Sequence, residues 1–121
     1  MVSAERIRAL FQTIDSMDAD AFAAFLTADA EFQFGNWPAV SGRAGAREAV
    51  AQFFGTIAGL SHEIIGIWQD GDVVTCRLRV TYTRQDGRKV SVPAADILRF
   101  RGEQIADYRI YIDVTPLYAP A

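Results

Sequence analysis

Cysteine and histidine are nearly absent from this chain of 121 residues, which contains one of each, Cys76 and His62. A lone cysteine cannot form a disulfide within the chain, so a reducing compartment is expected. Structural zinc sites draw four ligands mainly from cysteine and histidine, and the chain offers two such residues. The sequence therefore predicts neither a disulfide framework nor a metal site made by the protein alone.

An excess of positive charge and a long apolar segment are also lacking. The 15 acidic residues outnumber the 12 Lys and Arg residues, for a net charge of −3, so no basic field attracts nucleic acid or an anionic membrane. No apolar run approaches the roughly 20 residues that span a bilayer. The first residues open an amphipathic stretch, not a signal-peptide core. We expect a cytoplasmic protein that binds neither nucleic acid nor membranes.

Apolar residues make up half of the chain, and 12% of its residues are aromatic. This content is sufficient for a buried core in a chain of this length. No internal repeat, charge block or low-complexity segment marks a boundary. Residues 1–121 are therefore expected to form a single domain.

The first half of the chain shows the three- to four-residue periodicity of amphipathic helices. This pattern predicts a helix over residues 4–16 and a short second helix that begins after Asp18 as its N-cap. A third helix is expected over residues 44–57, with Gly59 as its C-terminal stop. Between them, residues 30–34 read as a short strand before the break at Gly35-Asn36-Trp37-Pro38.

From Leu60 onward the apolar pattern alternates with period 2, which is typical of strands. Strands are predicted over residues 61–69, 73–84, 89–101 and 104–114, separated by hairpin-type turns. Pro93 within the third of these indicates a bulge, an edge position or a bend. Helices followed by strands define an α+β fold, with N-terminal helices packed on a strongly curved, mainly antiparallel sheet.

This order of elements resembles the nuclear transport factor 2-like superfamily of cone-shaped, cystatin-like folds, over essentially the whole chain. Residues 18–30 look like its second helix and following acidic turn. Asn36-Trp37-Pro38 and Ser41-Gly42-Arg43 resemble a loop of limonene-epoxide-hydrolase-like proteins. Residues 95–100 and 108–113 resemble the last hairpin of SnoaL-like polyketide cyclases and ketosteroid isomerases. The resemblance implies an internal ligand pocket, but the superfamily also contains proteins without catalysis, so the fold does not decide the function.

Asp96 is the first candidate for a functional residue. It lies in an apolar strand segment, where a carboxylate is costly unless it is paired or neutral. By resemblance, its place matches a protonated aspartate of ketosteroid isomerases that donates a hydrogen bond to a developing oxyanion. The alternative is an aspartate paired with a neighbouring arginine and without a chemical role. Perturbed carboxylates mark functional sites often enough to favour the first interpretation.

The remaining machinery of these relatives is incomplete. The general base of the isomerases would fall near Phe34, and their tyrosine donor near Leu10 or Phe11, none of which transfers protons. Of the epoxide-hydrolase relay, Arg77 and Asn36 match, but its two carboxylates map to Arg79 and Ile110 and its tyrosine to Phe34. Both of these mechanisms are disfavoured. We predict Asn36, Phe34 and Ile110 as ligand-binding residues.

Two orientations of the strand over residues 73–84 remain open. By resemblance, Arg77, Arg79 and Thr81 face the pocket and bind a ligand or Asp96. By pattern alone, the arginines face water and the apolar set is core; that set is Val74, Cys76, Leu78, Val80 and Tyr82. In the first case the apolar set forms the surface of a homodimer. In the second, Asp96 has no cationic partner, and its pKa is raised.

Three further side chains are candidates. Tyr108 faces the pocket by resemblance, and its hydroxyl would contact a ligand carbonyl, although aromatic core packing is the commoner role. His62 is the only side chain whose ordinary pKa suits proton transfer near neutral pH. The alternative for His62 is a structural role in its strand. Trp37 would line the mouth of the pocket, unless it packs in the core or an interface.

The sequence thus predicts a small-molecule pocket protein resembling the SnoaL-like branch. It would be a cofactor-independent isomerase, cyclase or lyase, with Asp96 as the acid–base or oxyanion-stabilising group, assisted by His62, Tyr108 and Asn36. Its ligand would be small, apolar or amphipathic, with a carbonyl or hydroxyl group. The alternative is a non-catalytic ligand-binding or dimerisation module with a vestigial pocket.

Overall fold

The first helix, α1 (Ala4–Asp15), forms where its apolar stripe predicts it. The computed structural model describes residues 2–120. The Ser3 hydroxyl accepts a hydrogen bond from the amide of Arg6 at 3.1 Å, which satisfies a free N–H group at the start of the helix. The stripe of α1 is buried, and α1 contacts the strand β3; its buried members are Ile7, Leu10 and Phe11.

Helices α2 (Ala19–Ala23) and α3 (Arg43–Phe54) follow. Asp18 caps α2 as predicted, since its carboxylate accepts a backbone amide hydrogen at 3.0 Å. The predicted end of α3 at residue 57 is wrong. The amide of Gly55 already bonds back to the last turn of the helix, and Gly59, the predicted stop, begins a strand instead.

Six strands are formed by residues 2–120, in the spatial order β2-β1-β6-β5-β4-β3. Their bounds are β1 (Leu26–Phe34), β2 (Val40–Ser41), β3 (Gly59–Asp70), β4 (Val73–Thr83), β5 (Lys89–Arg101) and β6 (Gln104–Ile112). The four long strands lie where the period-2 pattern predicts them and pair antiparallel. The strand β1 is longer than predicted and runs parallel to β6.

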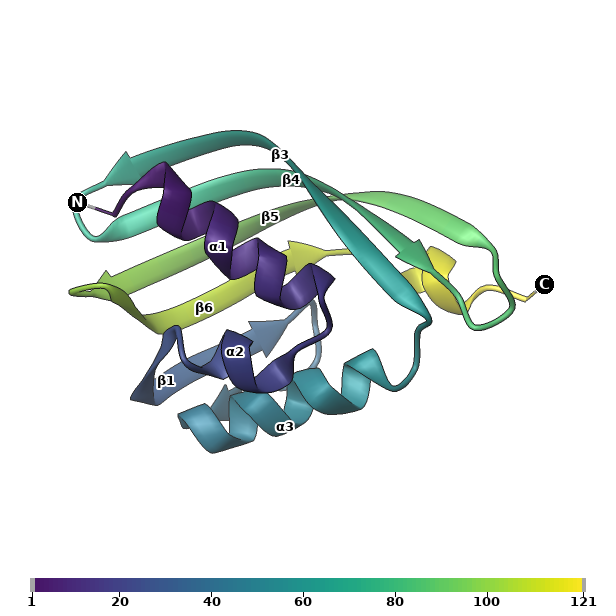
Figure 1. Cartoon of the computed structure of the whole chain (residues 1–121), viewed down its shortest axis with the longest axis horizontal. Coiled ribbons are helices and arrows are strands. Elements are labelled where there is room, and N and C mark those ends of the chain that lie inside the picture. The colour runs from purple at the N-terminus through teal and green to yellow at the C-terminus, as the bar shows by residue number, and fades with distance from the viewer. Residues whose placement is uncertain (1, 121) are drawn as a thin grey trace.

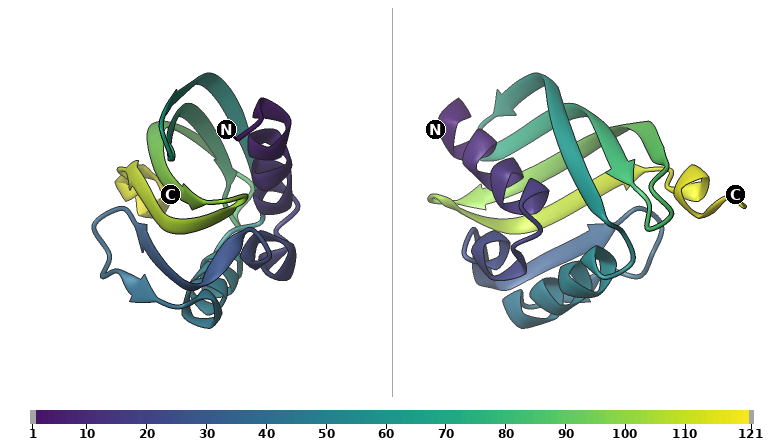
Figure 2. Two further views of the ribbon diagram at one scale, coloured as in Figure 1. Left: turned by 90° about the vertical axis from the view of Figure 1, so that its left-hand side faces the viewer. Right: turned by 45° about the vertical axis from the view of Figure 1, so that its right-hand side comes forward.

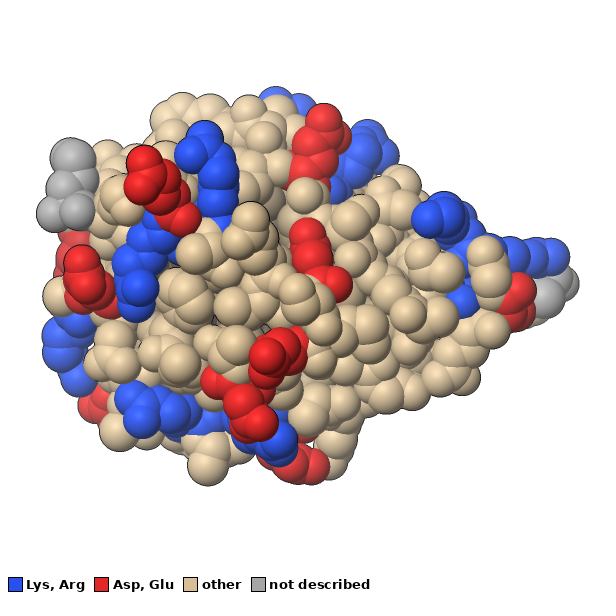
Figure 3. All heavy atoms as spheres, viewed as in Figure 1, with Lys and Arg blue, Asp and Glu red and all other residues tan. Residues whose placement is uncertain are grey.

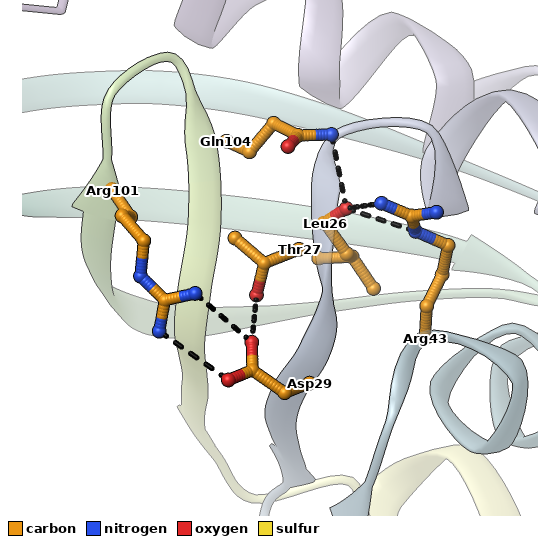
Figure 4. Close-up of polar contacts among 6 residues, drawn as sticks. All are labelled: Leu26, Thr27, Asp29, Arg43, Arg101 and Gln104. Atoms are coloured by element: carbon orange, nitrogen blue, oxygen red, sulfur yellow. Dashed lines mark hydrogen bonds and ion pairs between the residues drawn. The ribbon is translucent and has the colours of Figure 1, made fainter.

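A polar cluster fixes the start of β1 against α3 and β6 (Figure 4). Arg43 donates two hydrogen bonds, of 3.0 and 2.7 Å, to the carbonyl oxygen of Leu26. Gln104 donates to the same oxygen at 3.2 Å, and Arg101 pairs with Asp29. The register between β1 and β6 shifts at this point, so these side chains satisfy backbone groups that the irregular ladder leaves free.

The sheet is open and strongly curved, and the three helices lie on its concave side (Figures 1 and 2). In the end-on view of Figure 2 the strands β3 to β6 arch around the space beside α1. A 3₁₀ turn, η1 (Thr115–Tyr118), follows β6 at the narrow end of the molecule. The buried apolar residues gather between the concave face and the helices. The predicted α+β arrangement is confirmed.

Pro93 occupies an edge position within β5. It lies one residue beyond the last β5–β6 pair, Ala94 with Ile112, so that β5 is paired there with β4 alone. The β4–β5 register continues through Pro93 without a bulge. Of the three options that proline indicated, an edge position is therefore the one observed.

The strand β4 presents its apolar side chains to the core. Arg77 and Arg79 are exposed, so the inward orientation of the arginines, suggested by resemblance, is wrong. The predicted dimer surface is buried within the monomer; its members are Val74, Cys76, Leu78, Val80 and Tyr82. The alternation of the strand itself indicated this orientation. Exposure of the face with five apolar side chains to water would cost the most free energy, so this face is buried.

Acidic and basic side chains are interspersed over the helix-bearing face and do not gather by sign (Figure 3). Within residues 2–120, no helix has both the length and the apolar character needed to cross a bilayer.

Candidate functional site

A cavity of about 60 Å³ lies between the concave face of the sheet and the helices. It has room for several water molecules or the reactive part of a small organic molecule, since one water needs about 10–15 Å³. Most of its walls are apolar, and four side chains bring polar groups to it. The lining residues are Ile14, Phe22, Phe32, Phe34, Trp37, Ala49, Val50, Phe53, Phe54, Leu60, His62, Val80, Tyr82, Ala94, Asp96, Tyr108, Ile110 and Ile112.

Asp96 brings a carboxyl group to this cavity from the middle of β5. It pairs with Cys76 of β4 and Ile110 of β6, and only 2% of its surface is exposed. The Tyr108 hydroxyl donates a hydrogen bond to Oδ2 of Asp96 at 3.0 Å. The second oxygen, Oδ1, is buried and has no hydrogen-bond partner among residues 2–120. A buried carboxyl oxygen without a partner is costly, which is typical of a ligand site.

Burial raises the pKa of Asp96 from 3.8 to about 7, because an ionised carboxylate loses its hydration there. The electrostatic influence of His62 and the hydrogen bond from Tyr108 act in the opposite direction. Because Arg77 and Arg79 face outward, no cation of β4 faces Asp96. This is the orientation for which the sequence predicted a raised pKa of Asp96. Burial likewise raises the pKa of the Cys76 thiol to about 12, so Cys76 stays a neutral core residue. Asp96 therefore keeps its proton to a much higher pH than an exposed aspartate does.

His62 reaches the same cavity from β3 and is held by Asp15, the last residue of α1. Its Nδ1 lies 2.5 Å from Oδ1 of Asp15, and its backbone amide donates to Oδ2 of Asp15 at 3.0 Å. In neutral imidazole this contact assigns the hydrogen to Nδ1 and leaves the lone pair on Nε2. The Phe11 ring packs against the imidazole at 4.9 Å. Asp15 thus fixes the orientation of the His62 ring on the cavity wall.

Asp15 was missed by sequence reasoning. Its contact with His62 spans 47 residues and exists only because α1 packs on β3. A weak signal was present, since a carboxylate at the C-terminal end of a helix opposes the helix dipole. The unfavourable interaction of such a carboxylate with the helix dipole is offset where the carboxylate accepts a hydrogen bond from another element.

The structure brings together most of the predicted site residues. His62, Asp96 and Tyr108 line one cavity, and so do Phe34, Trp37 and Ile110. The other three are placed elsewhere: Asn36 is exposed in the turn after β1, and Arg77 and Arg79 are exposed on the outer face of the sheet. Their prediction as ligand-binding residues does not fit this cavity, because exposed side chains on these surfaces point away from it.

No group of three metal-ligating side chains occurs within the described part of the chain. The cavity instead brings together a buried carboxyl group with a raised pKa and an imidazole whose ring orientation is fixed. These are the two partners of general acid–base chemistry.

The SnoaL-like domain model matches residues 7–108. The chain belongs to the SnoaL-like domain family. This membership confirms the resemblance inferred from the sequence. The matched residues include most of those that line the cavity, Asp96 and Tyr108 among them. No curated protein matches the chain.

Solved structures share the fold of this SnoaL-like domain at low sequence identity. A ketosteroid isomerase-like protein from Catenulispora acidiphila, in complex with trimethylamine, aligns with a TM-score of 0.86 and 20% identity, covering 95% of this chain and 90% of its own. A putative SnoaL-like polyketide cyclase from Jannaschia aligns with a TM-score of 0.80 and 20% identity, covering 96% and 92%. An epoxide hydrolase/cyclase-like enzyme of pyran ring formation in the polyether salinomycin aligns with a TM-score of 0.78 and 21% identity, covering 92% and 90%.

Proposed function

We propose that this SnoaL-like domain is a cofactor-independent proton-transfer enzyme, an isomerase, cyclase or lyase, acting on a small apolar molecule with a carbonyl or hydroxyl group. The observation that carries the proposal is the buried Asp96, whose Oδ1 has no partner in the described chain and whose cavity also receives His62. A cytoplasmic location and a homodimeric state are parts of the same proposal.

The acid is Asp96. In its neutral form the carboxyl group donates a hydrogen bond to the carbonyl oxygen of the substrate and stabilises the negative charge that develops there. The Tyr108 hydroxyl keeps the other carboxyl oxygen engaged. An apolar environment strengthens such a hydrogen bond, because water does not compete for it.

The base is His62. Its Nε2 removes a proton from the carbon next to the carbonyl group, and the resulting imidazolium is stabilised by the Asp15 carboxylate. The proton then returns to another carbon of the enolate in an isomerisation. In a cyclisation, the enolate carbon instead attacks a second carbonyl carbon of the same molecule, whose π electrons move to its oxygen, and the imidazolium returns its proton to that oxygen. The abstracted proton ends on the product in both cases, and no external reagent is required.

Three comparisons support this proposal. The Catenulispora protein is known in complex with trimethylamine, a small molecule of few atoms, which agrees with a cavity of about 60 Å³ here. The Jannaschia protein is described as a putative cyclase, and the salinomycin enzyme as one of ring formation. Both descriptions fit a reaction that needs an acid and a base in a dry cavity.

Deuterium exchange into a simple ketone tests the proposal without knowledge of the natural substrate. The protein is incubated with cyclohexanone in deuterated buffer, and loss of the hydrogens next to the carbonyl is followed by proton NMR. We expect exchange well above the buffer rate, and a decrease of about a hundredfold in Asp96→Asn and in His62→Gln.

The control is Asp72→Asn, which makes the same chemical change in an exposed turn and should exchange like the wild type. Exchange at the buffer rate by the folded wild type, or equal rates in all four proteins, would contradict the proposal. Thermal stabilisation by the ketone without exchange would instead support the alternative of a non-catalytic binding module.

A further inference from the structure

A second hollow, of about 290 Å³, lies beside the cavity and is lined by residues of β1, α3 and the segments around β2 and η1. We call it the outer chamber. It shares a wall with the inner cavity, formed by Phe32, Phe34, Trp37, Ala49 and Phe53. Its remaining walls come from β2, the end of α3 and the turn η1; they are Pro38, Val40, Gln52, Thr56 and Tyr118.

Three aromatic rings form the partition between the two spaces. Phe34 and Trp37 stack with ring centroids 5.1 Å apart and planes at 22°. Phe53 contacts Phe34 at 4.8 Å and Trp37 at 6.2 Å. The contacts between these rings are weak compared with the backbone hydrogen bonds of the surrounding sheet.

Trp37 is the ring of this partition that can move at least cost. It lies in the turn between β1 and β2 with 42% of its surface exposed, whereas Phe53 is 7% exposed. The turn itself is anchored through the backbone, because the amide of Trp37 bonds to the Phe34 carbonyl at 3.1 Å and its carbonyl accepts from Gln33 at 3.0 Å. Rotation of the Trp37 side chain would join the two spaces without disturbing the sheet.

We infer that the substrate is an elongated molecule, with its carbonyl group in the inner cavity and an aromatic tail in the outer chamber beneath Trp37. This inference rests on the proposed function for the position of the carbonyl group. The inner cavity accommodates a reactive head only, and the chamber on the other side of the partition presents aromatic faces on which a ring can stack. Gln52, Thr56 and Tyr118 on the wall of the chamber are exposed residues, so the tail can end in a polar substituent that meets solvent.

Two ketones with the same head test this assignment, cyclohexanone and 4-phenylcyclohexanone. Binding is measured at equilibrium by tryptophan fluorescence in a Trp68→Phe background, in which Trp37 is the remaining tryptophan. We expect the phenyl group to lower the Kd by about tenfold or more and to change the Trp37 emission.

Filling the outer chamber should abolish this gain. In Val40→Phe, and independently in Gln52→Phe, both ketones should bind with the affinity of cyclohexanone. Thr75→Phe adds the same ring on the outer face of the sheet and should retain the full gain. Two filling variants guard against a folding defect in either one, which circular dichroism would reveal.

Equal affinity of the two ketones, a gain that survives both filling variants, or no binding of either ketone at millimolar concentration would overturn the inference. The readout is binding and not turnover, so the two proposals fail separately. A phenyl gain without deuterium exchange retains the chamber and refutes the reaction, whereas exchange without a phenyl gain does the reverse.

Discussion

The phenolic hydroxyl of Tyr108 donates a hydrogen bond of 3.0 Å to Oδ2 of Asp96, while Oδ1 of the same carboxyl group has no partner within residues 2–120. The two residues are diagonal neighbours on β5 and β6, since Asp96 lies opposite Ile110. One carboxyl oxygen is held by the protein and the other is available to a ligand. The proposed acid depends on this division.

Removing the Tyr108 hydroxyl should raise the pKa of Asp96 further. The hydrogen bond from Tyr108 lowers that pKa, so Tyr108→Phe should move the alkaline limit of deuterium exchange to higher pH. It should also cost about 1–3 kcal/mol of folding free energy, because Oδ2 becomes a second buried oxygen without a partner. Tyr82→Phe, which changes another tyrosine of the cavity, is the control. An unchanged pH profile in Tyr108→Phe would contradict the assigned contact.

Asp15 should act through His62 and not on the substrate. Asp15→Asn weakens the contact that orients the imidazole, so the kcat of ketone exchange should fall about tenfold or more. The KM should change little, because Asp15 is not among the cavity-lining residues. The double variant with His62→Gln should be no slower than His62→Gln alone. Glu5→Gln, at the other end of α1, is the control; additive losses in the double variant would refute this role.

Stability should depend on pH through Asp96. Its pKa is about 7 in the folded protein, against 3.8 for a free carboxyl group, so between about pH 4 and pH 7 the folded state keeps a proton that the unfolded state has released. The free energy of unfolding should therefore fall as the pH rises through this window, by about 4 kcal/mol at most, and the contribution should level off above pH 7.

Urea denaturation of the wild type and of Asp96→Asn across this pH range measures the effect. The asparagine variant cannot ionise, so its stability relative to the wild type should increase from pH 4 to pH 7. Parallel stability curves for the two proteins would show that Asp96 titrates alike in the folded and unfolded states.

The expected homodimer cannot use the apolar side chains of β4 that the sequence suggested for it, because they are buried in the core. Three large apolar side chains are exposed on the outer face of the sheet, namely Trp68, Ile97 and Tyr111, and we expect a dimer through this face. Trp68→Glu should shift sedimentation to a monomer at about 100 micromolar protein, whereas Lys89→Glu, at the start of β5, should not. A wild type that sediments as a monomer at this concentration would exclude the dimer.

The helices and strands of this fold were predictable because each has one apolar face, which appears in the sequence as a periodic pattern. The period-2 pattern located β3 to β6 within two residues, and the stripe of Ile7, Leu10 and Phe11 located α1. The alternation of β4 also favoured outward arginines, and the resemblance to relatives was misleading at that point. The free energy gained by burying apolar side chains applies to every strand. A ligand-binding arginine, in contrast, occurs only in particular relatives and does not transfer with the fold.

The site was predictable only in part. Asp96 was identifiable as a carboxylate in an apolar strand, because burial of a charge conflicts with the local pattern. Its neighbours were not: the contact of His62 with Asp15 and the position of Trp37 between two chambers follow from tertiary packing, which periodicity does not encode. Asn36 was predicted to line the pocket but is exposed in the turn after β1. The direction of this turn decides whether the Asn36 side chain faces the cavity or water, and periodicity does not encode it.

Burial raises the pKa of Asp96 to about 7, so that near neutral pH part of this carboxyl group is neutral and can donate a hydrogen bond to a ligand. A titration of its side-chain carboxyl carbon by ¹³C NMR, assigned by comparison with Asp96→Asn, tests this most directly. We expect a transition near pH 7 and a shift of this resonance when a ketone binds. A transition close to pH 4, as for a solvated aspartate, would show that burial does not raise the pKa of Asp96.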